Sequence, residues 1–496
     1  MRKILANLLV LALLLTAFPV CASDELPTFT SAEEKICYAI DNRLIEINVE
    51  EFNITEDPQV FFRRFLSHHS NYFYVTLSYY YMTKNDTVAM YVIDYIWQGE
   101  ELDNKISQFN RAVKDLIESI PKGISDEDKV LYLHDYLCIN VEYDTRVYEH
   151  PELTDHDPTI RTSYGALVDK KAVCQGVSKA YVLLLETLGI EAHIARSSEM
   201  DHEWIMVKLG DHFYHIDTTY DSPVVRLKDG ELLQFPGYIT HKYFLKSDAQ
   251  MLELGHYGWE TFENVVADDS TTYDNAYFYQ AMGMIAIIDG DKYFVRAKGE
   301  EGELVKLDGK TGYFRVLFTM HRHTWCPCCH QRDFYWHGNT TRFAYDGKGT
   351  HVYFNHGNRI FSYNIKNDSA VMVKMVSLDG YIFSCAFIDE KLEIIDITDF
   401  EKDENGNVII NSNGSRIPVY EHVTVEINDD AQETLLMGDV NSDNSINTLD
   451  MLALRKYLAH TGEVNTQTAD LCFDHKITAR DAFYLRCILS GKGFNI

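Results

Sequence analysis

The stretch 163–223 constrains this chain more than any other, because it predicts a helix that begins at a cysteine and then a hairpin with a histidine and an aspartate. Apolar side chains recur at spacings of three and four residues, which predicts an amphipathic helix. They are Val177, Ala180, Tyr181, Leu184, Leu185 and Leu188. Gly189 follows as the glycine that ends such a helix. Cys174 is therefore expected in or just before the first turn, where free N–H groups and the helix dipole stabilise a thiolate.

A β-hairpin is predicted directly after this helix. Residues 203–209 and 212–217 are two short runs of strand-forming composition. Between them stand Gly210 and Asp211, a plausible two-residue turn. A turn of this length fixes which residues of the two strands face each other.

The register of the hairpin decides which polar side chains meet. The two-residue turn places Leu209 opposite His212 and Trp204 opposite Asp217. His202 then lies on the same face as Asp217, one diagonal step away, and diagonal neighbours are about 7–8 Å apart. A thiol at a helix start, a nearby imidazole and a carboxylate that orients the imidazole form a nucleophilic triad. A purely structural role for these residues, and a triad that is present but inactive, are the alternatives.

Four short motifs in this stretch carry a family resemblance: Tyr164–Leu167, Val173–Gly176, His202–Trp204 and Tyr214–Pro223. With them, the chain resembles the transglutaminase-like, papain-related superfamily in its bacterial secreted form. The order of the three candidate residues, Cys then His then Asp, is also that of the family. The resemblance implies a papain-like core, in which the cysteine helix packs on an antiparallel sheet.

The resemblance assigns a role to each member of the triad. Cys174 would attack an acyl carbonyl, and its backbone N–H would help to bind the oxyanion. His202 would take the thiol proton and pass it to the leaving amine, while Asp217 would hold the imidazole tautomer. Hydrolysis of a peptide or isopeptide bond is the first expectation for this site, and protein crosslinking is the second. A non-catalytic adaptor that binds protein or glycan is the alternative from a different class.

The N-terminus and the charge of the chain indicate its compartment. Arg2 and Lys3 precede the apolar run 4–17, and small residues end near Ala22, which is typical of a secretory signal peptide. We expect secretion, and no later segment is apolar enough to span a membrane. The net charge of −30 argues against general nucleic-acid binding, because neutralising phosphates needs clustered Lys and Arg.

A chain of 496 residues is too long for one core, so we expect a multidomain α+β protein. Between residues 266 and 425, short strand-like runs alternate with Asp-Gly turns, and the stretches 292–317 and 350–375 both read as three-stranded meanders. The expected order is a signal peptide (1–22), an N-terminal α/β region (23–122), the catalytic domain (123–265), a β-rich accessory domain (266–425), a linker (426–436) and a small helical domain (437–496).

One cysteine-rich segment of the β-rich domain is a candidate metal site. Cys326 and Cys329 have C-x-x-C spacing, Cys328 lies between them, and three histidines are close by. Thiolate and imidazole are zinc ligands, although the second ligand pair of a complete zinc motif is missing. Zn²⁺ or another soft metal, a disulfide or redox pair, and an inert loop all remain open.

The C-terminal region contains a tandem repeat of a calcium-loop pattern. In the first copy, oxygen ligands occupy loop positions 1, 3, 5, 9 and 12, and position 7 offers its backbone carbonyl. These residues are Asp439, Asn441, Asp443, Asn447 and Asp450, with Ser445 at position 7. The second copy begins 31 residues later and has Asp470, Asp474 and Asp481, with Lys476 at position 7. Its positions 3 and 9 are Cys472 and Thr478, so its Ca²⁺ site is expected to be the weaker one.

This tandem resembles a type I dockerin, the module that attaches cellulosomal enzymes to the cohesins of a scaffoldin. The resemblance covers residues 437 to 490 and implies a helical domain with EF-hand-like loops and bound Ca²⁺. It also implies a cohesin domain as the partner. The expected contacts come from loop positions 10 and 11, which here are Thr448, Leu449, Ala479 and Arg480. A secreted, cellulosome-associated enzyme with a protein or peptide substrate follows as the overall expectation.

Overall fold

A computed structural model describes residues 27–490 of the chain, apart from positions 77, 149, 151–152, 154–156, 227–231, 236, 270, 300, 321–341, 358, 377–380, 410–417, 428–436, 444 and 472–475. The chain divides into two compact units. The first takes in Met1–Ile120, Val141–Thr219 and Tyr243–Tyr273, and the second takes in Pro121–Asn140, Tyr220–Lys242 and Asp274–Ile496. None of the described helices is long and apolar enough to cross a membrane.

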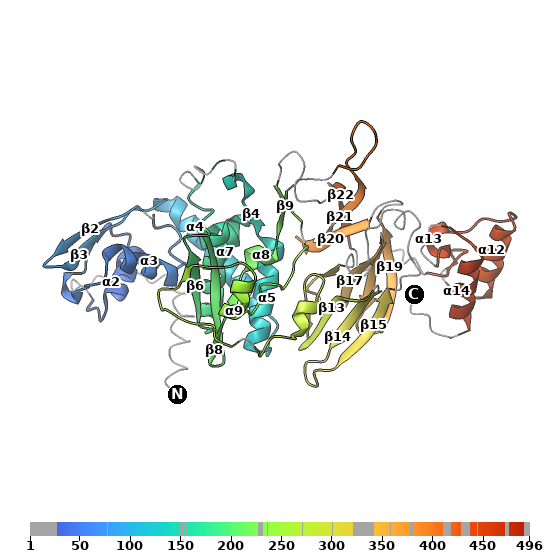
Figure 1. Ribbon diagram of the computed structural model, residues 1–496, viewed down its shortest axis with the longest axis horizontal. Helices are drawn as coiled ribbons and strands as arrows, with labels where there is room; N and C mark the ends of the chain where they lie inside the picture. Colours follow the sequence, from blue (N-terminus) through green and yellow to red (C-terminus); the bar gives the residue numbers. More distant parts are fainter. Residues whose placement is uncertain are drawn as a thin grey trace. The chain divides into compact units, whose positions relative to one another are not determined.

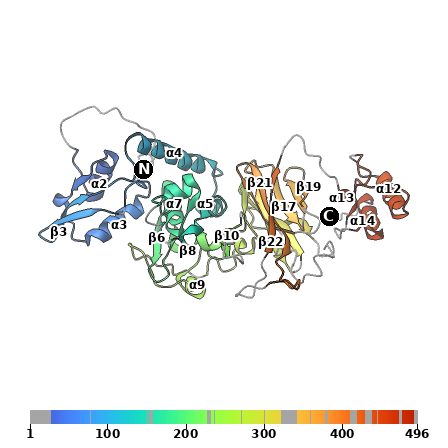
Figure 2. The same cartoon turned by 90° about the horizontal axis from the view of Figure 1, so that it is seen from above.

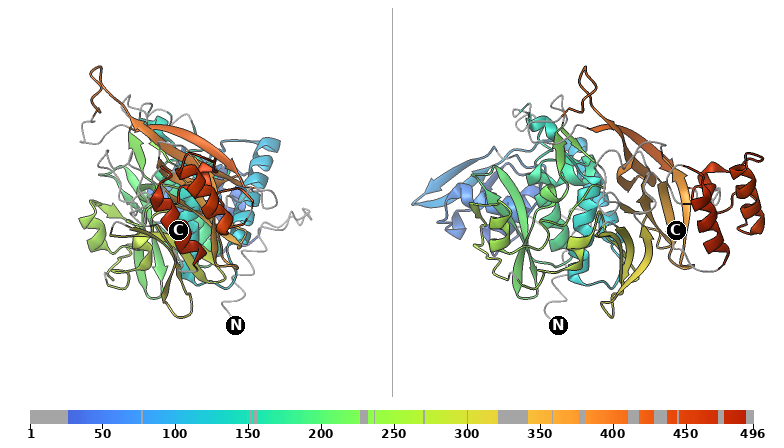
Figure 3. Two further views of the ribbon diagram at one scale, coloured as in Figure 1. Left: turned by 90° about the vertical axis from the view of Figure 1, so that its right-hand side faces the viewer. Right: turned by 45° about the vertical axis from the view of Figure 1, so that its right-hand side comes forward.

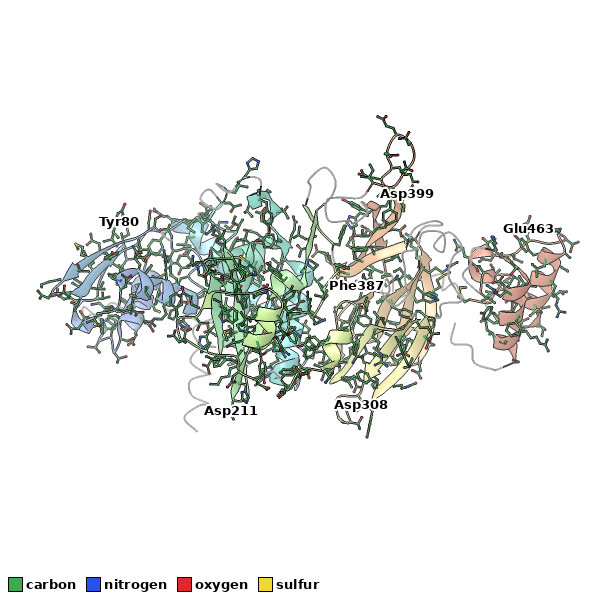
Figure 4. The ribbon with its side chains drawn as sticks, in the orientation of Figure 1. Tyr80, Asp211, Asp308, Phe387, Asp399 and Glu463 are labelled. Carbon is green, nitrogen blue, oxygen red and sulfur yellow. The ribbon has the colours of Figure 1, made fainter. Side chains whose placement is uncertain are left out.

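The N-terminal part of the first unit combines helices with a small antiparallel sheet of order β1-β3-β2. Its elements are α2 (Ala32–Asp41), β1 (Glu46–Asn48), η1 (Glu50–Phe52), α3 (Pro58–His68), β2 (Tyr80–Lys84), β3 (Thr87–Val92) and α4 (Gly99–Ser119). Asp57 caps α3 by accepting hydrogen bonds from two backbone N–H groups, and Pro58 occupies the first helical turn. The aromatic rings of Phe62 and Tyr91 stack in the core, whereas Tyr80 on β2 is exposed (Figure 4).

The remainder of the first unit is a helix packed on a four-stranded antiparallel sheet of order β11-β6-β7-β8 (Figure 1). Its elements are β4 (Glu142–Tyr143), η2 (Thr145–Tyr148), η3 (Gly165–Asp169), β5 (Lys171–Ala172), α7 (Cys174–Thr187), β6 (Ala192–Ser197), β7 (His202–Leu209), β8 (His212–Ile216), α9 (Asp248–Glu253) and β11 (Trp259–Glu260). Helix α7 contacts β6 and β7. Figure 2 shows α7 and β6 from above. The expected packing of the cysteine helix on an antiparallel sheet is therefore present.

The second unit contains one long helix and most of the strands of the chain. Its helices and short strands are α5 (Asp126–Asn140), β9 (Val224–Arg226), β10 (Leu232–Gln234) and η4 (Tyr277–Gln280), and α8 (Thr218–Asp221) runs across the boundary between the units. Ser125 caps α5, because its hydroxyl accepts a hydrogen bond from the Asp128 N–H at 3.1 Å.

Three antiparallel sheets follow in the second unit, and consecutive strands are neighbours in each of them (Figure 3). The first has β12 (Ala286–Ile288), β13 (Asp291–Lys298), β14 (Glu301–Leu307) and β15 (Phe314–Met320). The second has β16 (Phe343–Tyr345), β17 (His351–His356), β18 (Arg359–Asn364) and β19 (Ser369–Met375), and the third has β20 (Tyr381–Ile388), β21 (Lys391–Phe400) and β22 (Pro418–Glu426). The meanders predicted at 292–317 and 350–375 are confirmed, and each gains one further strand before it.

The C-terminal repeat forms two similar helices joined by a short one. They are α12 (Thr448–Leu458), α13 (Thr466–Ala469) and α14 (Ala479–Leu489). Both long helices begin with a reciprocal capping box, in which the N-cap residue and the aspartate three positions later bind each other's backbone N–H. Leu454 and Leu485 are fully buried, as expected for the face on which the two copies pack.

Candidate active site

Helix α7 begins at Cys174, as the sequence predicts. Val173 before it is extended, with φ −92° and ψ 176°, so that the chain turns directly into the helix at the cysteine. The helix ends where Gly189, at φ +76°, allows a left-handed turn that other residues rarely adopt. Cys174 itself is buried.

Gly176 explains how the chain approaches the start of this helix so closely. A Cβ atom at this position would lie 2.7 Å from the carbonyl oxygen of Ile160 and 2.9 Å from that of Thr162. Both neighbours are backbone atoms that cannot move aside without shifting the segment. Gly176, two residues after Cys174, is therefore a packing requirement, because it lets the residues before Tyr164 lie against the first turn of α7.

The hairpin has the predicted turn and register. Leu209 pairs with His212 across a two-residue turn, in which Gly210 has φ +63° and Asp211 lies at the tip (Figure 4). His202 is the first residue of β7, and Asp217 follows the last residue of β8, so that both candidate residues lie at the same end of the hairpin. This is the end that faces the start of α7 in the fold of the first unit.

His202 is held between a carboxylate and the thiol. Its Nε2 lies 2.6 Å from Oδ2 of Asp217. Burial alone would lower the pKa of His202, but the charge and hydrogen bond of Asp217, together with a hydrogen bond to the Cys174 side chain, raise this pKa to about 10. The imidazole is therefore protonated at neutral pH and is linked to both other members of the predicted triad.

Asp217 is completely buried and is fixed by more partners than the sequence reveals. Its Oδ2 is 2.6 Å from His202 Nε2 and 2.8 Å from Nε2 of His256, and its Oδ1 accepts a hydrogen bond from the Thr219 N–H at 3.1 Å. Burial raises the pKa of Asp217, but the two histidines outweigh burial and hold this pKa below its usual range. The contact of His256 with Asp217 could not be predicted from the sequence, because His256 lies 39 residues after Asp217 and belongs to no recognisable motif.

Tyr143 is a second residue of the site that sequence analysis does not single out. It lies on β4, which pairs in parallel with β5 just before Cys174. Burial, the nearby Cys174 and Tyr148 raise the pKa of the Tyr143 phenol above its usual range, although a hydrogen bond with the Cys174 backbone opposes this shift. A bond that favours the phenolate is donated to its oxygen, so the Cys174 N–H points at the Tyr143 hydroxyl. This N–H is the group predicted to bind the oxyanion.

The raised pKa of His202 gives the first prediction. A histidine whose pKa is about 10 in the fold, against about 6.5 when unfolded, contributes stability that is complete below pH 6.5 and is lost as the pH rises through 10. We expect the gap in free energy of unfolding between the wild type and His202→Gln to shrink over this interval. Urea unfolding at a series of pH values measures it, and a gap that stays constant from pH 6 to pH 10.5 would contradict the prediction.

The first loop of the C-terminal repeat gathers three carboxylates. One oxygen each from Asp439, Asp443 and Asp450 lies within 4.8 Å of the others, a geometry suited to a metal ion. Asp450 is fully buried and also accepts hydrogen bonds from the N–H groups of Val440 at 2.7 Å and Asn447 at 2.8 Å.

Asn441 and Asn447, at positions 3 and 9, lie in the same loop. The Asn441 amide donates to Asp443, and the Asn447 side chain caps α12. Ser445 is exposed and donates its N–H to Asp443.

The second loop is described only in part. Asp470 and Asp481 are buried, and Lys476 is exposed. Asp481 accepts a hydrogen bond from the Thr478 N–H at 2.8 Å, as Asp450 does from Asn447 in the first copy. Asp474 lies outside the described residues, so its role as a ligand remains a prediction. The Zn²⁺ site predicted at Cys326, Cys328 and Cys329 lies outside the described residues as well.

The four predicted partner contacts lie on the surface of the repeat. Thr448, Leu449, Ala479 and Arg480 are all exposed. Apolar side chains next to them are exposed as well, with 49% of Leu452 and 58% of Phe483 accessible. These two residues occupy equivalent positions in the two copies, so each copy presents an apolar side chain beside its predicted contacts.

Comparison with known families places these two regions. Residues 114–218 match the model of the transglutaminase-like superfamily, and residues 437–489 match the model of the dockerin type I domain. The chain joins a transglutaminase-like domain to a type I dockerin. This architecture is that of a cellulosome-type component with a papain-like cysteine-enzyme fold, and type I dockerins typically bind calcium and imply a cohesin partner.

Solved structures give only distant likenesses. A TGase crystal structure is 15% identical, with a TM-score of 0.21, and the match covers 32% of this chain and 47% of that one. Arylamine N-acetyltransferase from Salmonella typhimurium is 11% identical, with a TM-score of 0.20, and covers 54% of this chain and 86% of its own. The chain thus spans about half of the length of the TGase. No curated protein sequence matches the chain.

Proposed function

We propose that the transglutaminase-like domain is a cysteine enzyme that cleaves a peptide or isopeptide bond through a thioester at Cys174. The observation that carries this proposal is the continuous link from Asp217 through His202 to the thiol at the start of α7. A buried carboxylate, an imidazolium and a thiolate in that order are the parts that nucleophilic catalysis by cysteine requires.

In the proposed reaction, His202 holds the proton of the Cys174 thiol, and the thiolate sulfur attacks the carbonyl carbon of the substrate amide. The C–N bond then breaks, and the proton on His202 passes to the leaving amine, which leaves an acyl thioester on the cysteine. A water molecule attacks the thioester, gives one proton to His202 and releases a carboxylic acid together with the thiolate. Asp217 keeps the imidazole oriented throughout, because its Oδ2 is anchored by His256 on the other side.

Tyr143 gives the second prediction. Its hydroxyl accepts a hydrogen bond from the Cys174 backbone, whose N–H an oxyanion would need. We expect Tyr143→Phe to free this donor and to raise kcat/KM for a small acyl substrate by about two- to tenfold, a modest share of what one such donor contributes. Initial rates of hydrolysis of an activated amide substrate by the wild type and by Tyr143→Phe measure the ratio of their kcat/KM values. A loss of more than tenfold would mean instead that the phenol itself donates to the oxyanion.

Crosslinking remains the second candidate, because a lysine amine could resolve the same thioester in place of water. Hydrolysis is proposed first because it needs only one protein substrate at the site. The deciding experiment is mass spectrometry of a mixed protein pool incubated with the enzyme. New chain termini support hydrolysis, new Gln–Lys links support crosslinking, and neither product from an otherwise folded protein would refute an enzymatic role and favour a non-catalytic adaptor.

We propose further that the enzyme is secreted and is carried on a scaffoldin through its dockerin. Calcium would bind in the first loop between Asp439, Asp443 and Asp450, whose oxygens already converge. The exposed residues of the contact positions, with Leu452 and Phe483 beside them, would meet the cohesin. Leu449 and Arg480 occupy equivalent positions but differ in character, so a single binding orientation is proposed rather than two.

A further inference from the structure

A group of two histidines and one glutamate outside the proposed active site joins three distant segments of the first unit. His68 is the last residue of α3, His193 lies on β6, and Glu263 follows β11. Nε2 of His68 is 2.6 Å from Oε1 of Glu263, and Nδ1 of His193 is 3.1 Å from Oε2 of the same carboxylate. One carboxylate thus lies between two imidazole rings, whose centroids are 6.0 Å apart.

His193 is the buried member of the group. Its side chain is only 9% exposed, and its Nδ1, which faces Glu263, forms no hydrogen bond of acceptable geometry within the described chain. A buried polar atom whose hydrogen bond is poorly aligned is incompletely satisfied, and an ion bound at this position would complete its interactions. Glu263 is the one described group in contact with this nitrogen, and at 3.1 Å the two groups are close enough to bind one ion between them.

The outer nitrogen of each ring also faces a carboxylate. Nδ1 of His68 is 3.8 Å from Glu186, and Nε2 of His193 is 3.3 Å from Glu191. Histidines that bind a metal through one nitrogen usually present the other to a carboxylate, which fixes the ring and raises its basicity. Both rings show this arrangement around the same central carboxylate.

We propose that His68, His193 and Glu263 bind a zinc-type divalent cation. One ligand atom from each of the three residues lies within 4.8 Å of the others. Nε2 of His68 and Nδ1 of His193 are the nitrogens that face the carboxylate of Glu263, so we take these as the ligand atoms. Ligands at about 2.0–2.2 Å from Zn²⁺ need only small movements to reach this geometry. Two imidazoles with one carboxylate suit Zn²⁺ and its neighbours and do not suit Ca²⁺ or Mg²⁺, which prefer oxygen ligands throughout.

The site is open enough for an ion to enter. The side chains of His68 and Glu263 are 31% and 26% exposed, which leaves a solvent-facing position for a water ligand. A second described group, His134 with Asp135 and His241, is buried on all sides and has a less accessible path for an ion. A cation at the open group would tie the end of α3 to the sheet beneath α7, so its binding should stabilise the first unit.

The test uses the full-length protein, stripped of metal by a chelator and then titrated with zinc in excess calcium, which keeps the dockerin loops occupied. We expect His193→Gln and Glu263→Gln each to take up one zinc equivalent fewer than the wild type. His212→Gln is the matched control, because His212 also pairs with an acid, Asp268 at 3.2 Å, but on an exposed part of the same unit. This control should retain the wild-type stoichiometry.

X-ray absorption separates this site from any zinc on the cysteines of the segment 321–341. The equivalent lost in the variants should have only nitrogen and oxygen neighbours, whereas zinc on cysteine has sulfur neighbours. If a buried substitution prevents folding, His68→Gln on the more exposed ring gives the same comparison, and zinc should raise the Tm of the wild type but not of this variant. Equal zinc uptake by the wild type and all three variants, or zinc bound to sulfur alone, would overturn the proposal.

Discussion

Cys174→Ala should abolish cleavage of amide bonds while the protein stays folded, because it removes the only atom that can form the proposed thioester. Alanine fills most of the space of a buried cysteine at the first position of α7, so we expect an unchanged circular dichroism spectrum. Product formation from a peptide library, followed by mass spectrometry, measures the effect. Activity that survives in Cys174→Ala would refute the triad.

Cys37 provides a matched control for this experiment. Its thiol also lies near an imidazole, 3.8 Å from Nε2 of His69. Burial raises the pKa of Cys37 to about 11, and burial lowers the pKa of His69, so this pair is neutral. Among the described residues, no ion pair is formed between His69 and a carboxylate, in contrast to His202 and Asp217. Cys37→Ala should therefore keep full activity. Iodoacetamide should label Cys174 faster than Cys37 at neutral pH, and equal rates would contradict the prediction.

The two other members of the triad should show graded losses. Asp217→Asn removes the charge that holds His202 in its cationic form, and we expect activity to fall by about 10²- to 10⁴-fold, as in other triads with a neutralised acid. His202→Ala should slow both alkylation and turnover. The losses in a double variant should not add, because the three residues act as a unit.

The helix and the hairpin of the site could be predicted because their signals are local. Helix α7 follows from apolar spacing that ends at Gly189, and the register of the hairpin follows from the two-residue turn at Gly210. Tyr143 could not be predicted to lie at the site, because its pairing beside Cys174 depends on a two-residue parallel bridge, β4 with β5, that is too short to leave a periodic pattern.

Contacts between distant segments could not be predicted from the sequence, for a different reason. His68 and Glu263 are 195 residues apart, and His256, which follows α9, reaches Asp217 at a separation of 39 residues. Helix α9 contacts β8, and this packing is not encoded by any local spacing. Such contacts depend on how elements pack, and no spacing within one element encodes them. The C-terminal repeat is the opposite case, since its two copies carry the same residue types 31 positions apart and each copy marks its own helix start with a capping box.

The last prediction concerns calcium binding in the first loop of the dockerin. The hydrogen bonds of this loop decide which aspartate should be substituted. Asp450 is a proposed calcium ligand, but it also accepts backbone hydrogen bonds from Val440, Asn441 and Asn447. Asp450→Ala would therefore unfold the loop whether or not calcium binds. Asp443 is exposed and offers a better substitution, because removing it takes one of three converging charges and leaves the backbone bonds of Asp450 in place.

We expect Asp443→Ala to weaken calcium binding in the first loop by at least about tenfold, because affinity in such loops follows the number of charged ligands. Glu463→Gln is the control, since it removes an equal charge from the exposed loop between α12 and α13 (Figure 4) and should change neither calcium affinity nor docking. Titration calorimetry measures the affinity, and a pulldown against a panel of type I cohesins, with and without chelator, measures docking. The three carboxylates repel one another in the absence of a cation, so the chelated wild type should lose its cohesin as Asp443→Ala does at limiting calcium. Docking that survives both the chelator and Asp443→Ala would show that the loop does not need the ion.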